Sequence, residues 1–453
     1  MEDMKFGICR VNDPVNSSTF GIVYRKACVL EFRYKKSTQN LDINRLPSFE
    51  PISNPEFGRF LLETKTMRLD MGICSFSFTG AIIPWLKSSS ICSQILEHII
   101  YSNIMNHLSQ NNLLSDNHHG FRARRSCETQ LITTVQELAK NMSSGKQIDA
   151  ILLDLSKAFD RVPHRRLLMK LDHYGIRGTT LKWIQDFLKG RTQQVLLDGT
   201  HSSTCDVDSG VPQGTVLGPL LFLIFINDLP EYVTSNARLF ADDCLLYRVI
   251  NNNNDQHQLQ NDLQQLEIWE KKWQMQFNAD KCFTIHLTKK RKTAEFNYTL
   301  HNHILEVTKD SKYIGVTFSS DLSWNNHISN ISAKANRTIG FLRRNIHSCP
   351  KEVKAAAYTT LVRPSIEYAS SVWDPYTRNN IHQLEAIQRR AARFVYNNFY
   401  DRVVTSMISR LQWESLEQRR AKARATFMYK IVNNLVDCPC GTHSHTIRQQ
   451  NQR

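Results

Sequence analysis

The spacing of apolar residues along the chain predicts a mixture of helices and short strands. From Ser88 to Ile104, isoleucine and leucine recur on one helical face, and serines stand at its start as candidate caps. Further helices are expected over 128–142, 165–174, 179–188, 220–227 and 259–273. Runs of aliphatic and aromatic residues predict strands at 146–154, 191–197, 237–240, 244–247, 283–287 and 313–318. Because these elements do not alternate regularly, we expect an α+β fold with the helices on one side of a mainly antiparallel sheet.

Two adjacent carboxylates, Asp242 and Asp243, lie between the strands predicted at 237–240 and 244–247. They are therefore expected in the tight turn that joins these strands. Carboxylates beside a buried hairpin cost free energy unless a cation compensates them. Mg²⁺, which prefers one or two carboxylates together with phosphate oxygens, would do so. The alternative is an ordinary solvated turn.

A third carboxylate, Asp154, ends the strand predicted at 146–154 and precedes Asp242 by 88 residues. If the two strands are neighbours in one sheet, all three carboxylates meet at one edge. Two metal ions about 3.5–4 Å apart could then activate an attacking hydroxyl and steady a transferring phosphoryl group. The alternative is that Asp154 only caps the turn that follows its strand.

Charge points to a polyanionic partner. The 453 residues carry a formal net charge of +15, and the pI is about 9.3. The excess is concentrated, because residues 325–435 contain 18 Lys and Arg against 7 Asp and Glu. This part of the chain is therefore predicted to be a basic module, while the length and the 41% hydrophobic content suit two or three globular domains.

The eleven cysteines form no CxxC pair. We therefore expect reduced thiols and an intracellular protein, in the nucleus, the cytoplasm or both, that is not secreted. Cys438, Cys440, His443 and His445 fit no zinc-finger spacing and are taken as incidental. The longest apolar run, 216–226, is too short to cross a bilayer, so no membrane partner is expected.

Six segments, in the right order, resemble the motifs of reverse transcriptases, most closely those of non-LTR (LINE-type, jockey-like) retrotransposons. Motifs A, B and C are resembled by 153–160, 210–214 and 240–243. The fingers motif and motifs D and E are resembled by 119–126, 277–282 and 313–316. The resemblance covers roughly 88–435 and is specific because six motifs share one order. It implies a right-hand polymerase, with fingers and palm around an antiparallel palm sheet and a helical, basic thumb-like region after it.

By resemblance, Asp154, Asp242 and Asp243 are the catalytic carboxylates that bind two Mg²⁺ ions, with Mn²⁺ as an alternative. Phe159 takes the place of the steric gate, whose ring would crowd a 2′-hydroxyl; its alternative is a core phenylalanine. Lys281 takes the place of the motif D lysine, a general acid for departing pyrophosphate. Otherwise Lys281 is only surface charge.

The resemblance also implies contacts with the nucleotide and the nucleic acid. Gln213, Gly214 and Arg122 are expected at the nucleotide, although an arginine of the fingers motif could instead make only an ion pair. Asp160 is expected to be structural. The predicted nucleic-acid contacts are Arg124, Arg125, Tyr313, Gly315, Arg343, Arg344, Arg389, Arg390 and Arg393.

The implied domains are 1–87, of unknown role, 88–319 as fingers and palm, 320–435 as the thumb-like region, and a polar tail at 436–453 that is expected to be disordered. Two features depart from the family pattern. Residues 1–87 show no sign of the endonuclease that normally precedes the polymerase. Residues 84–88 replace the family's Tyr-Arg-Pro-Ile segment. Both departures suggest a truncated copy of an element.

The expected function is that of an RNA-directed DNA polymerase. It would extend the 3′-hydroxyl of a DNA primer or target along an RNA template, with deoxynucleoside triphosphates (dNTPs) as substrates and no small-molecule cofactor beyond the metal. The alternative is a catalytically inactive remnant that still binds nucleic acid. An intron-maturase-type polymerase is a third option, which the sequences around Asp154 and Asp242 argue against.

Overall fold

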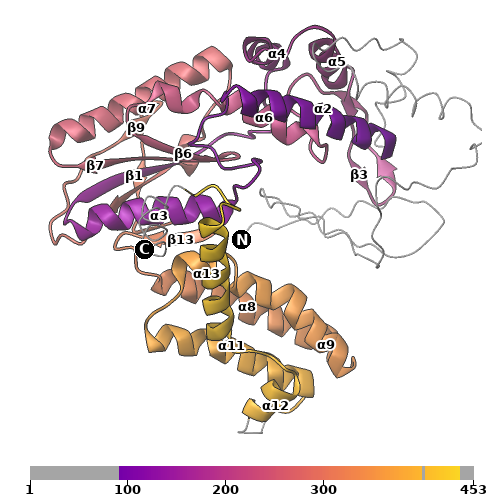
Figure 1. Ribbon diagram of the computed structural model, residues 1–453, viewed down its shortest axis with the longest axis vertical. Coiled ribbons are helices and arrows are strands. Elements are labelled where there is room, and N and C mark those ends of the chain that lie inside the picture. Colours follow the sequence, from indigo (N-terminus) through magenta and orange to yellow (C-terminus); the bar gives the residue numbers. More distant parts are fainter. Residues whose placement is uncertain (1–90, 400–403, 439–453) are drawn as a thin grey trace, which may run out of the picture. The chain divides into compact units, whose positions relative to one another are not determined.

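The computed structural model describes residues 91–399 and 404–438, all within one unit of the chain, Pro51–Arg453 (Figure 1). The predictions for residues 1–87, for the segment 84–88 and for Cys440, His443 and His445 lie outside the described residues. Most of the predicted polar tail also lies outside them. The described part combines helices with a mainly antiparallel sheet, which confirms the predicted α+β class.

The main sheet has five strands. In spatial order they are β11 (Glu306–Val307), β8 (Phe283–Leu287), β1 (Gln147–Asp154), β7 (Asp243–Ile250) and β6 (Asn236–Phe240). All neighbouring strands are antiparallel except the short pair β11 and β8. β6 and β7 form a hairpin with Ala241 and Asp242 in its turn, and β1 lies between β7 and β8. The sheet therefore places the end of β1 beside that turn.

Helices cover both faces of this sheet, so the predicted arrangement on one side only is wrong (Figure 1). Alternate residues of β1 belong to two different apolar cores. Ile151 packs in the core that contains α6 (Leu217–Ile226) and α7 (Asn253–Trp273), and Ala150 packs in the core that contains α3 (Cys127–Ser143). The reason is that β1 is apolar on both faces for most of its length, as strands buried on both sides are.

The remaining helices of this part are α2 (Ile91–Gln110), α4 (His164–His173) and α5 (Gly178–Leu188). α6 is apolar all round, and nine of its ten residues are buried. A helix of this kind is expected in the middle of a core, where α2 and α4 contact it. No helix in the described ranges has the length and apolar character needed to cross a membrane.

Two segments predicted as single strands contribute to hairpins. Residues 191–197 form β2 (Thr192–Gln193) and β3 (Leu196–Leu197), which pair with β5 (Cys205–Asp206) and β4 (Thr200–His201). Residues 313–318 span β12 (Asp310–Tyr313) and β13 (Val316–Ser319). The turn between β12 and β13 holds Ile314 and Gly315 at φ of 43° and 81°. The apolar pattern conceals this turn because isoleucine rarely adopts a left-handed conformation.

From residue 325 the described chain is helical, as predicted. The α-helices of this part are α8 (Asn325–Asn345), α9 (Lys351–Ala357), α10 (Ser370–Trp373), α11 (Arg378–Tyr396), α12 (Val404–Arg410) and α13 (Leu416–Val432). α8 packs against α11, and α10 contacts both α13 and α3. The buried Arg420 of α13 donates a 2.7 Å hydrogen bond to Asp374 Oδ1 after α10, which ties these helices together.

Candidate active site

The three predicted carboxylates lie at one end of the main sheet. Asp154 is the last residue of β1 and pairs across the ladder with Asp243, the first residue of β7. Directly opposite residues of antiparallel strands point to the same face, with Cβ atoms about 4.5–5.5 Å apart. Asp242 lies in the turn, after Ala241, whose φ of 53° is left-handed. Asp243 was also expected in this turn, but it already pairs with Phe240 in the ladder and so belongs to β7. The condition set by the sequence, that the strand of Asp154 and the strand of Asp243 are neighbours in one sheet, is therefore met, while the catalytic role of the carboxylates stays a prediction.

The predicted motif D segment runs beside Asp154. The backbone N–H of Asn278 donates to the Asp154 carbonyl at 2.8 Å, and the Asp154 N–H donates to Cys282 Sγ at 3.4 Å. These contacts bring Lys281 Nζ to 3.9 Å from Asp154 Oδ2. Because the Lys281 side chain is 66% exposed, this ion pair is weak, and the ammonium group remains available to a substrate.

The ring of Phe159 is half-buried and has a fixed position. It stacks on Phe222 of α6 with centroids 4.3 Å apart, and it makes an edge-to-face contact with Phe121, with centroids 6.3 Å apart. A ring held from two sides cannot swing away from a ligand without breaking these contacts. The packing is therefore compatible with both readings of Phe159, a gate and a core residue.

Asp160 joins the predicted motifs A and B. Its Oδ1 accepts a 2.9 Å hydrogen bond from Nε2 of the exposed Gln213. Gly210 lies so close to Asp160 that an added Cβ would be 2.8 Å from the Asp160 carbonyl oxygen. Gly214 has a φ of 81° in the turn that follows. Asp160 thus orients the side chain of Gln213. The sequence predicted only that Asp160 is structural, without naming this partner.

The predicted fingers motif packs directly on the turn that carries Asp242. His119 N–H donates to the Leu239 carbonyl at 3.0 Å, and Leu239 N–H donates to the Asn117 carbonyl at 2.9 Å. Gly120 follows, and a Cβ added there would lie only 2.6 Å from the backbone nitrogen of Ala241. The fingers motif therefore fixes the position of the residue that precedes Asp242.

The three arginines of this motif contact protein groups. Arg122 Nη1 donates to the Ser115 carbonyl at 2.6 Å, and Arg125 Nη2 to Asp116 Oδ1 at 2.6 Å. Arg124 Nη2 lies 3.1 Å from Asp437 Oδ1. These contacts match the alternative in which fingers arginines make ion pairs, and a role at template or triphosphate would require them to exchange partners. Their predicted contacts with substrate stay predictions.

Tyr313 does not reach the surface. Its side chain is 2% exposed, and its hydroxyl accepts a 3.0 Å hydrogen bond from Gln130 Nε2. Burial raises the pKa of Tyr313. A direct contact between this side chain and a nucleic acid, as the sequence suggested, is incompatible with that burial. Gly315, in contrast, is exposed in the adjacent turn.

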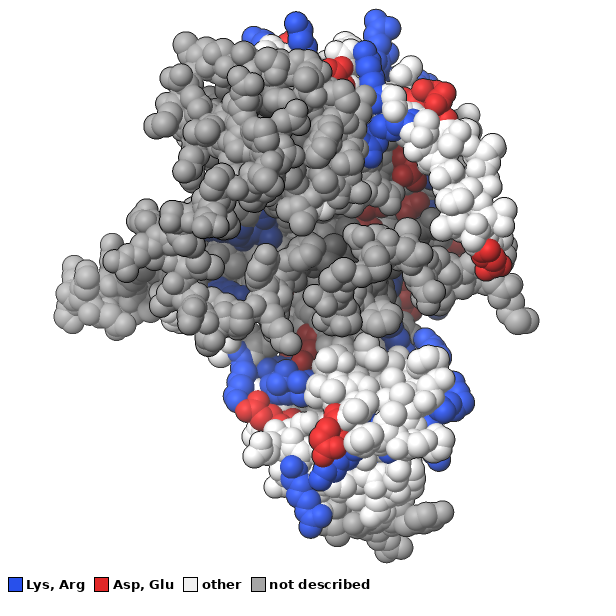
Figure 2. Space-filling view, turned by 90° about the vertical axis from the view of Figure 1, so that its right-hand side faces the viewer, with Lys and Arg blue, Asp and Glu red and all other residues white. Residues whose placement is uncertain are grey.

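The predicted phosphate contacts of the C-terminal helices lie on α8 and α11. Arg343 and Arg344 are exposed near the end of α8, and the Arg343 guanidinium lies 4.3 Å from the centre of the Phe399 ring. Arg390 Nη1 donates to Asn336 Oδ1 at 2.9 Å and so links α11 to α8. Arg389 and Arg393 are half-buried on α11. In Figure 2, Lys and Arg side chains stand out on the lower, helical part of the molecule, with fewer Asp and Glu among them.

Asp149 is a buried carboxylate that the sequence analysis did not single out. It accepts hydrogen bonds from Gln147 Nε2 at 2.8 Å, Tyr298 Oη at 2.7 Å and His286 Nδ1 at 2.7 Å. The available signal was a carboxylate within the apolar run from Ile148 to Leu153. Because Asp149 and its partners are enclosed, this cluster joins β1, β8 and the following loop, and it does not belong to the carboxylate site.

Two histidines near the turn that carries Asp242, His118 and His119, are buried without charge. Burial lowers the pKa of His118 and of His119 to about 3, and the nearby guanidinium of Arg125 adds to both shifts. Since both values lie below the usual 6.5, the unfolded chain takes up protons first as the pH falls. We expect the free energy of unfolding to drop between pH 7.5 and pH 5, by about 2 kcal/mol for each ring.

This pH effect is measured by chemical denaturation at both pH values. In His119→Gln, the drop in the free energy of unfolding between pH 7.5 and pH 5 should be smaller by the contribution of one ring, about 2 kcal/mol, whatever the stability of the variant. The exposed His303 serves as the matched control, and His303→Gln should leave the difference unchanged. If His119→Gln lost as much free energy of unfolding between the two pH values as the unaltered chain does, the lowered pKa of His119 would be contradicted.

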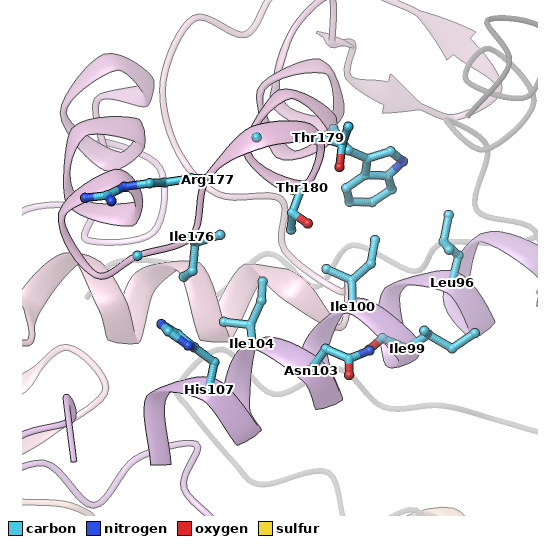
Figure 3. Close-up of a pocket in the computed structure, with 13 residues that line it drawn as sticks. Leu96, Ile99, Ile100, Asn103, Ile104, His107, Ile176, Arg177, Thr179 and Thr180 are labelled. Carbon is cyan, nitrogen blue, oxygen red and sulfur yellow. The ribbon is translucent and has the colours of Figure 1, made fainter. Parts of the chain in front are cut away.

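An apolar pocket of about 360 Å³ lies apart from the carboxylates, between α2 and the segment that joins α4 to α5 (Figure 3). Ile100 and Ile104 of α2 line one wall, and Trp183 of α5 lines another. No carboxylate lines this pocket. Within residues 91–399 and 404–438, no three His, Cys, Asp or Glu side chains are grouped so that they alone could hold a metal ion.

The sequence pattern of one known family, "Reverse transcriptase (RNA-dependent DNA polymerase)", matches residues 89–318. The chain belongs to the reverse transcriptase family. The matched region contains the carboxylate pair of β1 and β7, the fingers motif and the motif D segment. The predicted polymerase fold, with fingers and palm followed by a helical basic region, is confirmed.

Relatives of this chain come from non-LTR elements, as predicted. The chain is 25% identical over 312 residues to the probable RNA-directed DNA polymerase from transposon X-element of Drosophila melanogaster. The aligned residues cover 67% of this chain and 34% of that relative. The chain is 28% identical over 314 residues to the RNA-directed DNA polymerase from mobile element jockey of Drosophila funebris, covering 66% and 34%. The chain thus spans about a third of the length of these relatives.

Among solved structures, a telomerase from Candida tropicalis in complex with a fragment of telomeric RNA matches with a TM-score of 0.40 and 10% identity, covering 76% of this chain and 58% of the telomerase. A second match, a telomerase from Candida albicans, has a TM-score of 0.31 and 12% identity, covering 69% of this chain and 53% of the telomerase. Reverse transcriptases generally use divalent metal ions and act on nucleic acids.

Proposed function

We propose that this chain is an RNA-directed DNA polymerase of a non-LTR retrotransposon. The observation that carries the proposal is the register of the main sheet, in which Asp154 stands opposite Asp243, with Asp242 in the adjoining turn. Lys281 lies 3.9 Å from Asp154 at the same end. Carboxylates for metal ions and a nearby proton donor suit the transfer of a nucleotidyl group to a primer hydroxyl.

The carboxylates fit Mg²⁺. This ion usually takes only one or two protein carboxylates and completes its shell with water and substrate phosphate oxygens. A site shared between two strands therefore does not need three protein ligands in contact before the nucleotide arrives. Asp154, Asp242 and Asp243 would hold two Mg²⁺ ions, or Mn²⁺, which would activate the primer hydroxyl and neutralise charge on the phosphates.

The other residues would position and select the nucleotide. Phe159, held by Phe222, would exclude a 2′-hydroxyl and so favour dNTPs. Gln213, oriented by Asp160, and the adjacent Gly214 would lie along the nucleotide and template. The exposed ammonium group of Lys281 would donate a proton to the departing pyrophosphate.

The RNA template and the DNA primer or target would lie across the palm and the basic helices. Arg343 and Arg344 are exposed and could contact phosphates without reading sequence. We propose the boundaries 88–319 for fingers and palm and 320–435 for the thumb-like region, with action in the nucleus, the cytoplasm or both. In this proposal the metal is the only cofactor.

The test is primer extension by the purified chain. An RNA template with an annealed DNA primer, dNTPs and Mg²⁺ should give full-length DNA, and a chelator should abolish it. The Asp242→Ala/Asp243→Ala protein serves as the inactive control. Template binding without extension by the unaltered chain would overturn the proposal and favour the inactive, nucleic-acid-binding remnant.

Gly120→Ala should lower extension about 100-fold, because the new Cβ would lie 2.6 Å from the Ala241 nitrogen and displace the turn that carries Asp242. The displacement should also lower the free energy of unfolding by about 1–3 kcal/mol. Primer-extension rates and urea denaturation measure the two effects. Gly145→Ala is the matched control: a Cβ at Gly145 meets nothing within 4 Å, so only stability should change there, owing to its φ of 70°. Equal rates in all three proteins would contradict the argument.

A further inference from the structure

Four consecutive cations, Lys289, Lys290, Arg291 and Lys292, follow β8 at the end of the main sheet opposite the carboxylates. Leu287 pairs with Ile148 near the start of β1, so Asp154 lies six residues, or about 20 Å, further along that strand. All four side chains are exposed, and none forms an ion pair with another described residue. Like charges this close repel one another unless an anion joins them.

These four residues, 289–292, form a basic run that is fixed to the fold at both ends. Lys290 N–H donates to Thr288 Oγ1 at 3.1 Å, and Thr288 N–H donates to the Ser320 carbonyl at 2.9 Å. Further on, Ala294 N–H donates to Gln147 Oε1 at 2.9 Å, and Gln147 Nε2 donates back to the Ala294 carbonyl at 2.8 Å. The run is therefore a short anchored loop rather than a free extended tail.

Lys289 and Lys290 line a hollow of about 650 Å³, whose volume is within the usual range for ligand sites. Ala139 and Met142 of α3 form part of its wall. Tyr376, which is 90% exposed, also lines it, together with the half-buried Trp324. The hollow thus combines ammonium groups with an aromatic ring that is open to solvent.

The part of the hollow near the starts of α8 and α11 contains one carboxylate and two helix N-termini. Asp321 also lines the hollow, and its Oδ1 accepts a 2.9 Å hydrogen bond from the Ser323 N–H. α8 and α11 begin at this wall, and neither Trp324 nor Thr377 caps its helix through a side chain. The N–H groups at these two helix starts, which no N-cap side chain engages, add to the positive potential of the lysines. The balance therefore favours an anion, although one carboxylate stands nearby.

We infer that this hollow and the basic run bind single-stranded nucleic acid at a second site, distinct from the polymerase centre. Lys289 and Lys290 would pair with phosphates, and a base would stack on Tyr376. Cationic grooves with exposed aromatic rings suit single strands because every base has a face that can stack. The site would hold a part of the strand that is not being copied, about 20 Å from the carboxylates.

Two other partners of basic runs fit less well. A receptor that reads a basic peptide needs an extended segment, whereas this run is anchored through Thr288 and Ala294. An anionic membrane surface would use the lysines and leave the hollow and Tyr376 without a role. The nucleic-acid reading uses the cations, the hollow and the ring together.

The test measures binding of fluorescent 20-residue oligouridylate to the full chain that is already saturated with an unlabelled hairpin primer–template without overhang. Lys289→Gln/Lys290→Gln should weaken this binding and lower the salt slope by about 0.7 for each lost phosphate contact. Tyr376→Ala should weaken it roughly 5- to 150-fold, and Tyr376→Phe should retain it. Oligothymidylate in a parallel arm tells whether RNA or DNA is preferred.

The matched control is Lys182→Gln/Lys271→Gln, which removes two exposed charges from α5 and α7 and should leave oligouridylate binding unchanged. Extension on the short hairpin should be equal in all variants, so failure here is separate from failure of the proposed polymerase. Binding that is insensitive to both Lys289→Gln/Lys290→Gln and Tyr376→Ala would overturn the inference. So would a variant that loses binding to phosphatidylserine vesicles while its oligouridylate binding is intact.

Discussion

Asp154→Asn is expected to lower primer extension at least about 1,000-fold without loss of folding. The substitution keeps the shape of the side chain and removes the charge that would hold a metal ion, and a loss of about 4 kcal/mol of transition-state stabilisation corresponds to that factor. Folding should not suffer, because Asp154 stands opposite Asp243 in the ladder and like charges placed there are destabilising. The free energy of unfolding should rise by up to about 1 kcal/mol.

Primer-extension rates and urea denaturation of the same preparations check this pair of opposite effects. Asp280→Asn is the matched control, since Asp280 is an exposed carboxylate directly before Lys281 and should alter neither quantity by much. If Asp154→Asn retained extension within tenfold of the unaltered chain, the carboxylates would not be the catalytic centre. If it unfolded the protein, Asp154 would have a structural role instead.

Local sequence predicted the strands that carry the site. β1 and β8 have nearly the predicted bounds, and the hairpin of β6 and β7 has its turn at Asp242. Each of these elements is a short apolar run bounded by polar residues, and a strand can be predicted from such a run without knowledge of its neighbours. The pairing of β1 with β7 was only a condition in the sequence argument, because pairing between distant strands is decided by the cores on both faces of the sheet.

Contacts between distant segments could not be predicted. The apolar pattern does not reveal that Gly120 touches the backbone of Ala241, since both positions read as ordinary small residues. Nor does it tell that Arg122 is engaged with the Ser115 carbonyl, because guanidinium groups suit protein carbonyls as well as phosphates. The resemblance of its motif predicts a nucleic-acid contact for Tyr313, although its ring packs in the core beside α3.

The burial of Lys170 is the clearest structural feature that the sequence did not predict. Lys170 of α4 is 3% exposed, and its Nζ lies 2.6 Å from Asp228 Oδ1. It also lies 3.8 Å from the centre of the Trp273 ring, while Trp269 Nε1 donates to Asp228 Oδ1 at 2.9 Å. Burial lowers the pKa of Lys170 to about 8, and Asp228 opposes the shift. On sequence alone Lys170 reads as an ordinary surface lysine, because its partner is 58 residues away.

Lys170→Ala should therefore lower the free energy of unfolding by about 3–5 kcal/mol, since it leaves the Asp228 carboxylate without its cation in a largely enclosed site. Urea denaturation at neutral pH measures this loss. Lys170→Met/Asp228→Asn, which removes both charges and keeps most of the volume, should recover a large share of it. Lys272→Ala is the matched control: that lysine is exposed and lies 5.2 Å from the same Trp273 ring, so its removal should cost less than about 1 kcal/mol. Equal losses for Lys170→Ala and Lys272→Ala would show that the buried pair does not hold α4 against α6 and α7.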